Sequence, residues 1–184
     1  MSPQFPRRLI TVSEYYRMAE VGILKENEQV ELLNGELIRL SPIGSRHAMC
    51  VNKITRLFSN ILPSEVFVAV QNPVYLNSLT EPEPDIAIVR GPLDRYADHH
   101  PCPEDVLLLI EVADSTYRKD REIKLPLYAK NGIQESWIIH MEREEIEVYH
   151  SPSSESYETR KVFQKGEFIS ISSLGLEAEV AQML

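Results

Sequence analysis

The sequence has 184 residues, of which 43% are hydrophobic and 26% are charged, values ordinary for a globular domain with a core of its own. The net charge of −9 argues against a protein that coats nucleic acid by neutralising its phosphates, but it does not exclude a nuclease. No window approaches the roughly 18 consecutive apolar residues of a membrane span, and the first residues lack the apolar core of a signal peptide. We expect one cytoplasmic domain over residues 1–184 with no membrane partner.

The first third of the chain predicts two helices separated by a hairpin. Thr11 and Glu14 have the spacing of a capping box, which indicates a short helix to about Glu20. The Asn-Gly pair within VELLNGELIRL is the strongest short signal for a β-hairpin. Apolar residues at helical spacing then predict a helix between Ser45 and Leu62.

The rest of the chain alternates strand-like runs with one further helix. That helix is expected around residues 121–131, with Pro126 in its first turn or at a kink and Asn131-Gly132 as its stop. The order of elements predicts an α/β or α+β domain around one central mixed sheet, flanked by helices and with extra hairpins at both ends. The expected strands are 66–70, 74–76, 85–90, 105–112, 135–141, 145–150, 157–163 and 167–171.

The stretch EPEPDIAIVR places three acids at alternate positions with prolines between them. Proline favours extended geometry for itself and for the residue before it, so Glu81, Glu83 and Asp85 should point in roughly the same direction. The four apolar residues that follow are typical of a strand covered on both faces. Asp85 therefore sits where solvent meets the core. The alternative is a solvated strand end whose prolines block edge pairing.

Glu111 is the second acid of this kind, because it lies inside the nearly continuous apolar run DVLLLIEV. A carboxylate there costs several kcal/mol unless it is paired, protonated or bound to a cation. Neighbouring strands would bring Glu111 to Asp85, and two close carboxylates favour a hard cation such as Mg²⁺ or Mn²⁺. Such a site can activate water for phosphodiester hydrolysis. The alternative is two unrelated acids at strand ends.

Five segments together resemble the Uma family of putative restriction endonucleases, which belongs to the PD-(D/E)xK nuclease superfamily. In chain order they are VELLNGELIRLSP, RHAMCVNKI, PEPDIAIV, LLLIEVADST and DREIKLPLYAKNGIQESWII, and they cover about Val30 to Ile139. The resemblance implies a restriction-endonuclease-like fold and a Mg²⁺- or Mn²⁺-dependent endonuclease acting on DNA.

The resemblance also implies roles for individual residues. Pro84-Asp85 matches the PD element, so Asp85 would be a direct metal ligand, and Glu111 matches the (D/E) element as the second ligand. Ala113 stands where the superfamily has its lysine. The Uma family carries a lysine on the following helix instead, which matches Lys124.

Lys124 has competitors and an alternative role. Lys119 and Arg121 lie close to it in the same basic segment and compete for the same assignment. Alternatively, Lys124 is a solvated helix charge that pairs with Asp120 four residues earlier.

Two upstream residues also match family positions. Glu31 would complete the metal site directly or through water, and its alternative is an outward residue on a half-buried strand. His47 would contact phosphate or a carboxylate from the start of the second helix, and its alternative is a cap or a surface group.

The expected function is therefore a metal-dependent DNA endonuclease, with DNA as the substrate and a homodimer as the assembly, because symmetric cleavage of two strands suits a twofold axis. Two alternatives stay open. One is an inactive nuclease-fold module with a binding or regulatory role. The other is a structural homodimer in which the acids only pair with the basic segment.

Overall fold

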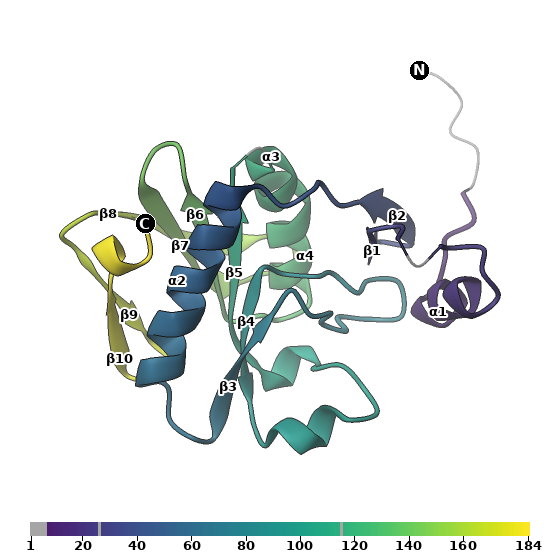
Figure 1. Ribbon diagram of the computed structural model, residues 1–184, viewed down its shortest axis with the longest axis horizontal. Coiled ribbons are helices and arrows are strands. Elements are labelled where there is room, and N and C mark those ends of the chain that lie inside the picture. The colour runs from purple at the N-terminus through teal and green to yellow at the C-terminus, as the bar shows by residue number, and fades with distance from the viewer. Residues whose placement is uncertain (1–6, 26, 115) are drawn as a thin grey trace.

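The computed structural model describes residues 7–25, 27–114 and 116–184. At its centre is a six-stranded sheet with the order β3-β4-β5-β6-β7-β8 (Figure 1). Strands β5 and β6 run parallel and every other neighbouring pair in this sheet is antiparallel, which confirms the mixed sheet expected from the sequence. The strands are β3 (Val66–Val70), β4 (Ile86–Arg90), β5 (Val106–Ala113), β6 (Glu135–His140), β7 (Glu145–Pro152) and β8 (Tyr157–Gln164).

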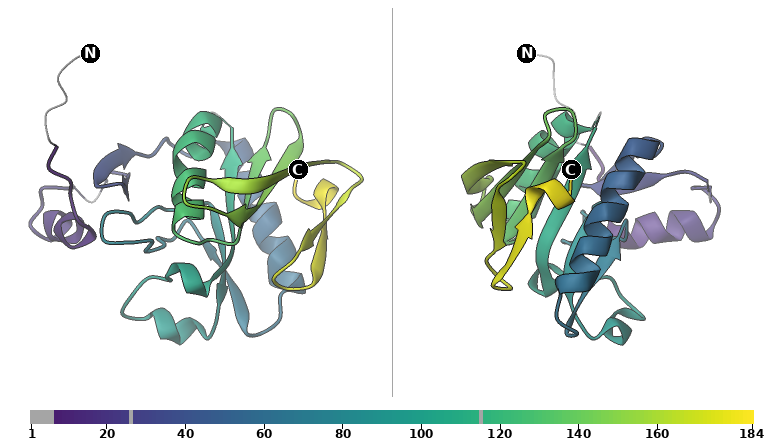
Figure 2. Two further views of the ribbon diagram at one scale, coloured as in Figure 1. Left: turned by 180° about the vertical axis from the view of Figure 1, so that it is seen from behind. Right: turned by 60° about the vertical axis from the view of Figure 1, so that its left-hand side comes forward.

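Helical segments cover both faces of the sheet. Helix α2 (Ser45–Ile61) lies across one face, in front of the sheet in Figure 1. The crossover from β5 to β6 lies on the other face, as the view from behind in Figure 2 shows. It consists of α3 (Tyr117–Lys119), a π-helical turn η3 (Asp120–Lys124) and α4 (Leu125–Lys130).

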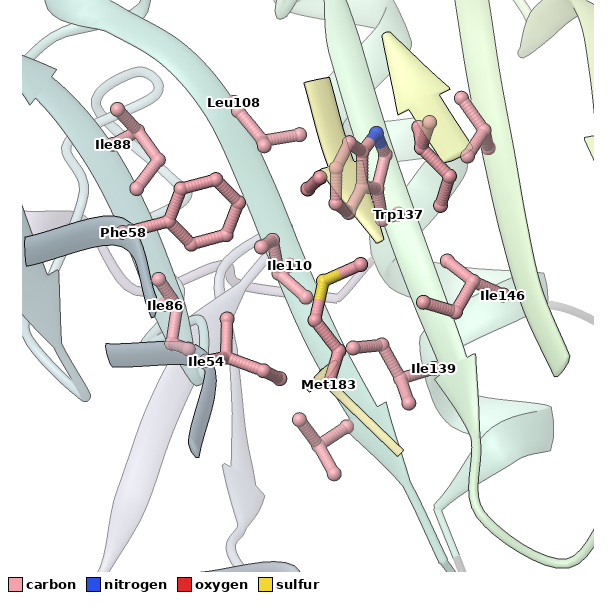
Figure 3. Packing of buried hydrophobic residues seen from close by; sticks show 14 of the residues in the cluster. Ile54, Phe58, Ile86, Ile88, Leu108, Ile110, Trp137, Ile139, Ile146 and Met183 are labelled. Atoms are coloured by element: carbon pink, nitrogen blue, oxygen red, sulfur yellow. The ribbon is translucent and has the colours of Figure 1, made fainter. Parts of the chain in front are cut away.

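The core forms two apolar layers, one on each face of the sheet, and together they bury the central strand β5 along its whole length. On the α2 side, Phe58 of the helix packs with Ile86, Ile110 and Trp137 from three neighbouring strands (Figure 3). On the α4 side, the alternate strand residues pack with Tyr128. The nearly unbroken apolar run of β5 is therefore explained by cover on both faces.

The N-terminal elements form a smaller unit at one end of the sheet (Figure 1). Helix α1 (Val12–Glu20) begins with the expected capping box at Thr11. Strands β1 (Val30–Leu33) and β2 (Glu36–Arg39) form the expected hairpin. Both turn residues have positive φ, 51° for Asn34 and 75° for Gly35, as a two-residue hairpin turn of this type requires.

The C-terminal hairpin lies beside α2, at the opposite end of the molecule from α1 (Figure 1). It consists of β9 (Phe168–Ile171) and β10 (Leu176–Glu179), followed by a 3-10 turn η4 (Val180–Gln182). Its apolar side chains belong to the core layer under α2. The sequence predicted β9 but not β10, whose alternating Leu-Glu-Ala-Glu pattern is short and weakly apolar.

The expected strand at residues 74–76 is wrong. Val74 and Leu76 donate their N–H groups to Pro82 and Thr80 within the same loop, at 3.0 Å each, and no named strand forms. Proline at 82 has no N–H to return the ladder bond, so the pairing cannot be extended. Two 3-10 turns, η1 (Leu93–Tyr96) and η2 (Pro103–Asp105), occupy the connection between β4 and β5.

The helix expected at residues 121–131 is longer and less regular than the sequence indicated. Helical structure begins at Tyr117, passes through the π turn, and places Pro126 in the first turn of α4, where a missing N–H is tolerated. Throughout the three described ranges, no helix combines the length and the apolar character that crossing a membrane would need.

Candidate functional site

The register of two central strands brings Asp85 and Glu111 to facing positions. Ile86 pairs with Ile110 in the antiparallel β4–β5 ladder, so Asp85, one residue before β4, falls opposite Glu111. Directly opposite residues in an antiparallel pair project from the same face. That face is the α4 side of the sheet, to which Leu109 also belongs. The two acids therefore meet at one end of the β4–β5 pair.

Asp85 is held by donors from three different segments. Its Oδ2 accepts the backbone N–H of Val112 at 2.8 Å and lies 3.1 Å from Nε2 of His47, in the first turn of α2. Gln71 approaches Oδ1 at 3.5 Å. Burial raises the pKa of Asp85, but the His47 and Val112 hydrogen bonds outweigh it and leave the pKa below its usual value. The hydrogen bond to Asp85 in turn raises the pKa of His47.

Glu111 is buried near the C-terminal end of β5 and has two donors on one oxygen. The Tyr128 hydroxyl donates to Oε1, and Nζ of Lys124 lies 2.9 Å from the same atom. Burial raises the pKa of Glu111 to about 8, because loss of hydration outweighs the attraction of Lys124. A further cation beside this carboxyl would favour its ionised form.

Lys124 reaches Glu111 from the helical crossover, whereas β5 itself carries no lysine. Ala113, two residues after Glu111, is buried on the same face of β5 and carries no charge. The ammonium of Lys124 is instead delivered by the π turn, a distortion that recurs at functional sites. Its side chain is 2% exposed, so the alternative of a solvated helix charge is wrong. Burial lowers the pKa of Lys124, but Glu111, Glu31 and Asp120 outweigh it and raise the pKa above its usual value.

Glu31 of β1 holds two lysines. Its Oε1 lies 3.0 Å from Nζ of Lys119, and its Oε2 lies 3.2 Å from Nζ of Lys124 and accepts the backbone N–H of Glu83 at 3.2 Å. The carboxylate is fully buried, which excludes the alternative of an outward residue. Burial raises the pKa of Glu31, but the two lysines outweigh it and lower the pKa. Both oxygens are thus engaged by ammonium groups, and a part for Glu31 at a metal site, directly or through water, stays a prediction.

Asp120 is a buried acid at this site that sequence reasoning missed. Asp120 is 2% exposed, it lines the same cleft as Asp85, and its Oδ2 accepts the Thr116 hydroxyl at 2.7 Å. Burial raises its pKa. The sequence signal was the four-residue spacing between Asp120 and Lys124, which on a regular exposed helix indicates an ion pair at the surface. The π turn that buries both residues has no sequence signature of its own.

A cleft of about 450 Å³ opens over these residues, between the α2 N-terminus, the β1–β2 hairpin and the crossover. Six acids line it against two lysines, Lys119 and Lys124, which leaves an excess of four negative charges when all six carboxyls are ionised and His47 is neutral. The acids are Glu28, Glu83, Asp85, Glu111, Asp114 and Asp120.

Oxygen donors with excess negative charge fit a hard divalent cation. Within the described ranges no group of three or more His, Cys, Asp or Glu side chains is arranged to hold a metal ion. Two carboxylates with the remaining positions left to water or substrate is the arrangement typical of Mg²⁺. The residues present therefore fit such an ion at Asp85 and Glu111.

Comparisons with known proteins found similarity to a family of putative restriction endonucleases and to a putative nuclease. A family model named Uma2, described as "Putative restriction endonuclease", matches residues 12–181. Among solved structures, a putative nuclease belonging to DUF820 from Anabaena variabilis superposes with a TM-score of 0.72 at 14% identity, over 95% of this chain and 97% of that one. At this identity the likeness shows a shared fold. No curated protein matches the chain.

Proposed function

The chain belongs to the Uma2 family of putative restriction endonucleases, and from this membership we propose that it is a metal-dependent endonuclease hydrolysing phosphodiester bonds in DNA. The observation that supports the proposal most strongly is the facing pair of Asp85 and Glu111 beside the buried ammonium of Lys124. Facing carboxylates at one end of a strand pair suit a divalent ion, and the buried ammonium adds a fixed positive charge beside them.

Each residue of the site has a distinct part in the proposal. Mg²⁺ or Mn²⁺ held by Asp85 and Glu111 would supply an activated water and neutralise phosphate charge. His47 and the Val112 N–H orient Asp85 through the same oxygen, Oδ2. Tyr128 and Lys124 fix Oε1 of Glu111. Such outer contacts keep carboxylates in a productive orientation.

Glu31 acts through the lysines in this proposal. Because it is buried and bonds both Lys119 and Lys124, it holds two positive charges at the wall of an otherwise acidic cleft. Without those charges and a bound cation, the excess of acids would repel the DNA backbone.

A plasmid-nicking assay tests the proposal. Wild-type protein with Mg²⁺ or Mn²⁺ should convert supercoiled plasmid to nicked or linear forms, and Asp85→Asn should lower that rate by at least about 100-fold, the scale of losing a key charge-stabilising group. Asp98→Asn is the matched control, because Asp98 is exposed in the β4–β5 connection. Intact plasmid with the wild-type protein and both metals would contradict the proposal.

A second candidate is an inactive nuclease-fold module that binds nucleic acid. Ala113 stands where the PD-(D/E)xK pattern has its lysine, and the absence of that lysine from the strand favours this candidate. Metal-induced thermal stabilisation together with an intact plasmid would support this candidate. The endonuclease proposal includes a homodimer for cutting two strands, and light scattering of the purified chain checks that state.

A further inference from the structure

The ammonium of Lys124 already lies beside three acceptors inside the protein, as many as it has N–H bonds. An ammonium group has three N–H bonds. Nζ of Lys124 lies 2.9 Å from Oε1 of Glu111, 3.2 Å from Oε2 of Glu31 and 3.2 Å from the backbone oxygen of Glu83. To contact a phosphate, Lys124 would have to leave one of these acceptors without its donor in a buried setting, which is costly.

Lys119 is placed differently, although it belongs to the same helical crossover. Its Nζ donates to Oε1 of Glu31 at 3.0 Å, and among the described residues this is the one acceptor that it contacts. Its side chain is 21% exposed and lines the cleft. Two of its three N–H bonds therefore remain for a ligand in the cleft.

Lys119 can bind a ligand without leaving Glu31, because one of its three N–H bonds serves Oε1 of Glu31 and two remain. Oε2 of Glu31 meanwhile stays beside Lys124 and accepts the Glu83 N–H. The buried carboxylate then remains paired, which a lone buried charge would not be. Moving Lys124 instead would disturb both Glu31 and Glu111.

From this division of donors we propose that Lys119 contacts a phosphate of the nucleic-acid substrate, whereas Lys124 is a positioning residue that holds Glu111 and Glu31. The inference rests on the proposed function for the identity of the phosphate-bearing ligand. It assigns substrate binding to the lysine on the cleft wall and orientation of the acids to the lysine beneath it.

Binding of a fluorescein-labelled DNA duplex, followed by anisotropy over a range of salt concentrations, tests this assignment. The parent protein carries Asp85→Asn so that the duplex is not cut, and Lys119→Met, Lys119→Arg and Lys124→Met are added separately. Arg118→Met is the matched control. It removes one positive charge from the residue before Lys119, but Arg118 is 86% exposed and pairs with Glu122.

Lys119→Met should weaken binding about tenfold or more and reduce the slope of log K against log salt by about 0.9, the effect of one phosphate contact. Lys119→Arg should keep the slope of the parent protein, and Arg118→Met should change the affinity less than Lys119→Met does. Lys124→Met should leave the slope unchanged while lowering the unfolding temperature.

Three results would overturn the inference: unchanged affinity and slope for Lys119→Met, a slope lost with folded Lys124→Met instead, or no measurable duplex binding by the parent. A slope lost with Lys119→Met in a protein that never nicks plasmid would support the phosphate contact and reject the endonuclease proposal. The two failures are therefore distinguishable.

Discussion

Nζ of Lys124 lies 2.9 Å from Oε1 of Glu111, in the buried layer between the helical crossover and β5. The pair joins a distorted helical turn to the central strand, and Glu31 extends it to the N-terminal hairpin. One ammonium thus connects three segments that are distant in the sequence. A buried ion pair is weak evidence for stability as a whole, but removing one partner leaves the other uncompensated.

Lys124→Met should therefore lower the free energy of unfolding by about 3–5 kcal/mol, because Glu111 and Glu31 lose a buried partner. Urea unfolding measures the change. Lys130→Met, at the exposed end of α4, is the control and should change stability by less than about 0.5 kcal/mol. Equal effects of the two substitutions on the free energy of unfolding would show that the buried pair does not contribute specifically to stability.

Gly35→Ala should destabilise the protein by about 1–3 kcal/mol more than Gly22→Ala. Both glycines have positive φ, 75° and 74°, so the backbone strain is matched. A Cβ at Gly35 would lie 2.5 Å from Cβ of Leu9, whereas nothing lies within 4 Å at Gly22. Thermal unfolding compares the two variants, and equal melting temperatures would reject the steric account of how the β1–β2 hairpin docks.

His47→Ala should weaken Mn²⁺ binding about 10–100-fold, because it removes a side chain that orients Asp85. Isothermal titration calorimetry measures the affinity. His99→Ala is the control, since His99 is exposed in the β4–β5 connection. If both variants bind Mn²⁺ as the wild type does, His47 has no orienting role.

Glu135 gives the protein a pH dependence that is independent of the cleft. The side chain is buried, accepts the Trp137 indole N–H at 2.8 Å, and burial raises its pKa to about 7 from an ordinary value of 4.5. Between these pH values the folded state holds a proton that the unfolded state has lost. The free energy of unfolding therefore falls as pH rises through this window.

Glu135→Gln should remove that dependence. Relative to wild type, the variant should gain up to about 3 kcal/mol of stability between pH 4 and pH 8, since one pKa unit is about 1.4 kcal/mol. Urea unfolding at several pH values measures the gain, with Glu158→Gln on an exposed position of β8 as the control. If the difference in the free energy of unfolding between Glu135→Gln and wild type did not vary with pH, the raised pKa would not belong to Glu135.

The sequence predicted the elements that carry strong local signals. The capping box at Thr11, the Asn-Gly turn, the helical spacing of α2 and the apolar run of β5 all depend on neighbouring residues, and all were confirmed. The same reasoning failed at residues 74–76, where apolar residues suggested a strand. There the outcome depended on the partner segment across the same loop, where Pro82 has no N–H to complete the hydrogen-bond ladder.

The site was predictable only in part, for a related reason. Asp85 and Glu111 stand out locally because an acid beside or within an apolar strand is anomalous, and the β4–β5 register brings them to facing positions. Asp120 and the shared Glu31 carboxylate do not stand out. Their burial follows from the π turn and from docking of the hairpin, both of which are tertiary features.

Calorimetric titration of Mn²⁺ into wild type, Asp85→Asn, Glu111→Gln and the double variant tests most directly whether these two carboxylates share one ion. We predict one site in the wild type, loss of that site in each single variant, and no further loss in the double variant, because both side chains bind the same ion. Wild-type affinity in Asp85→Asn or in Glu111→Gln would contradict the shared site.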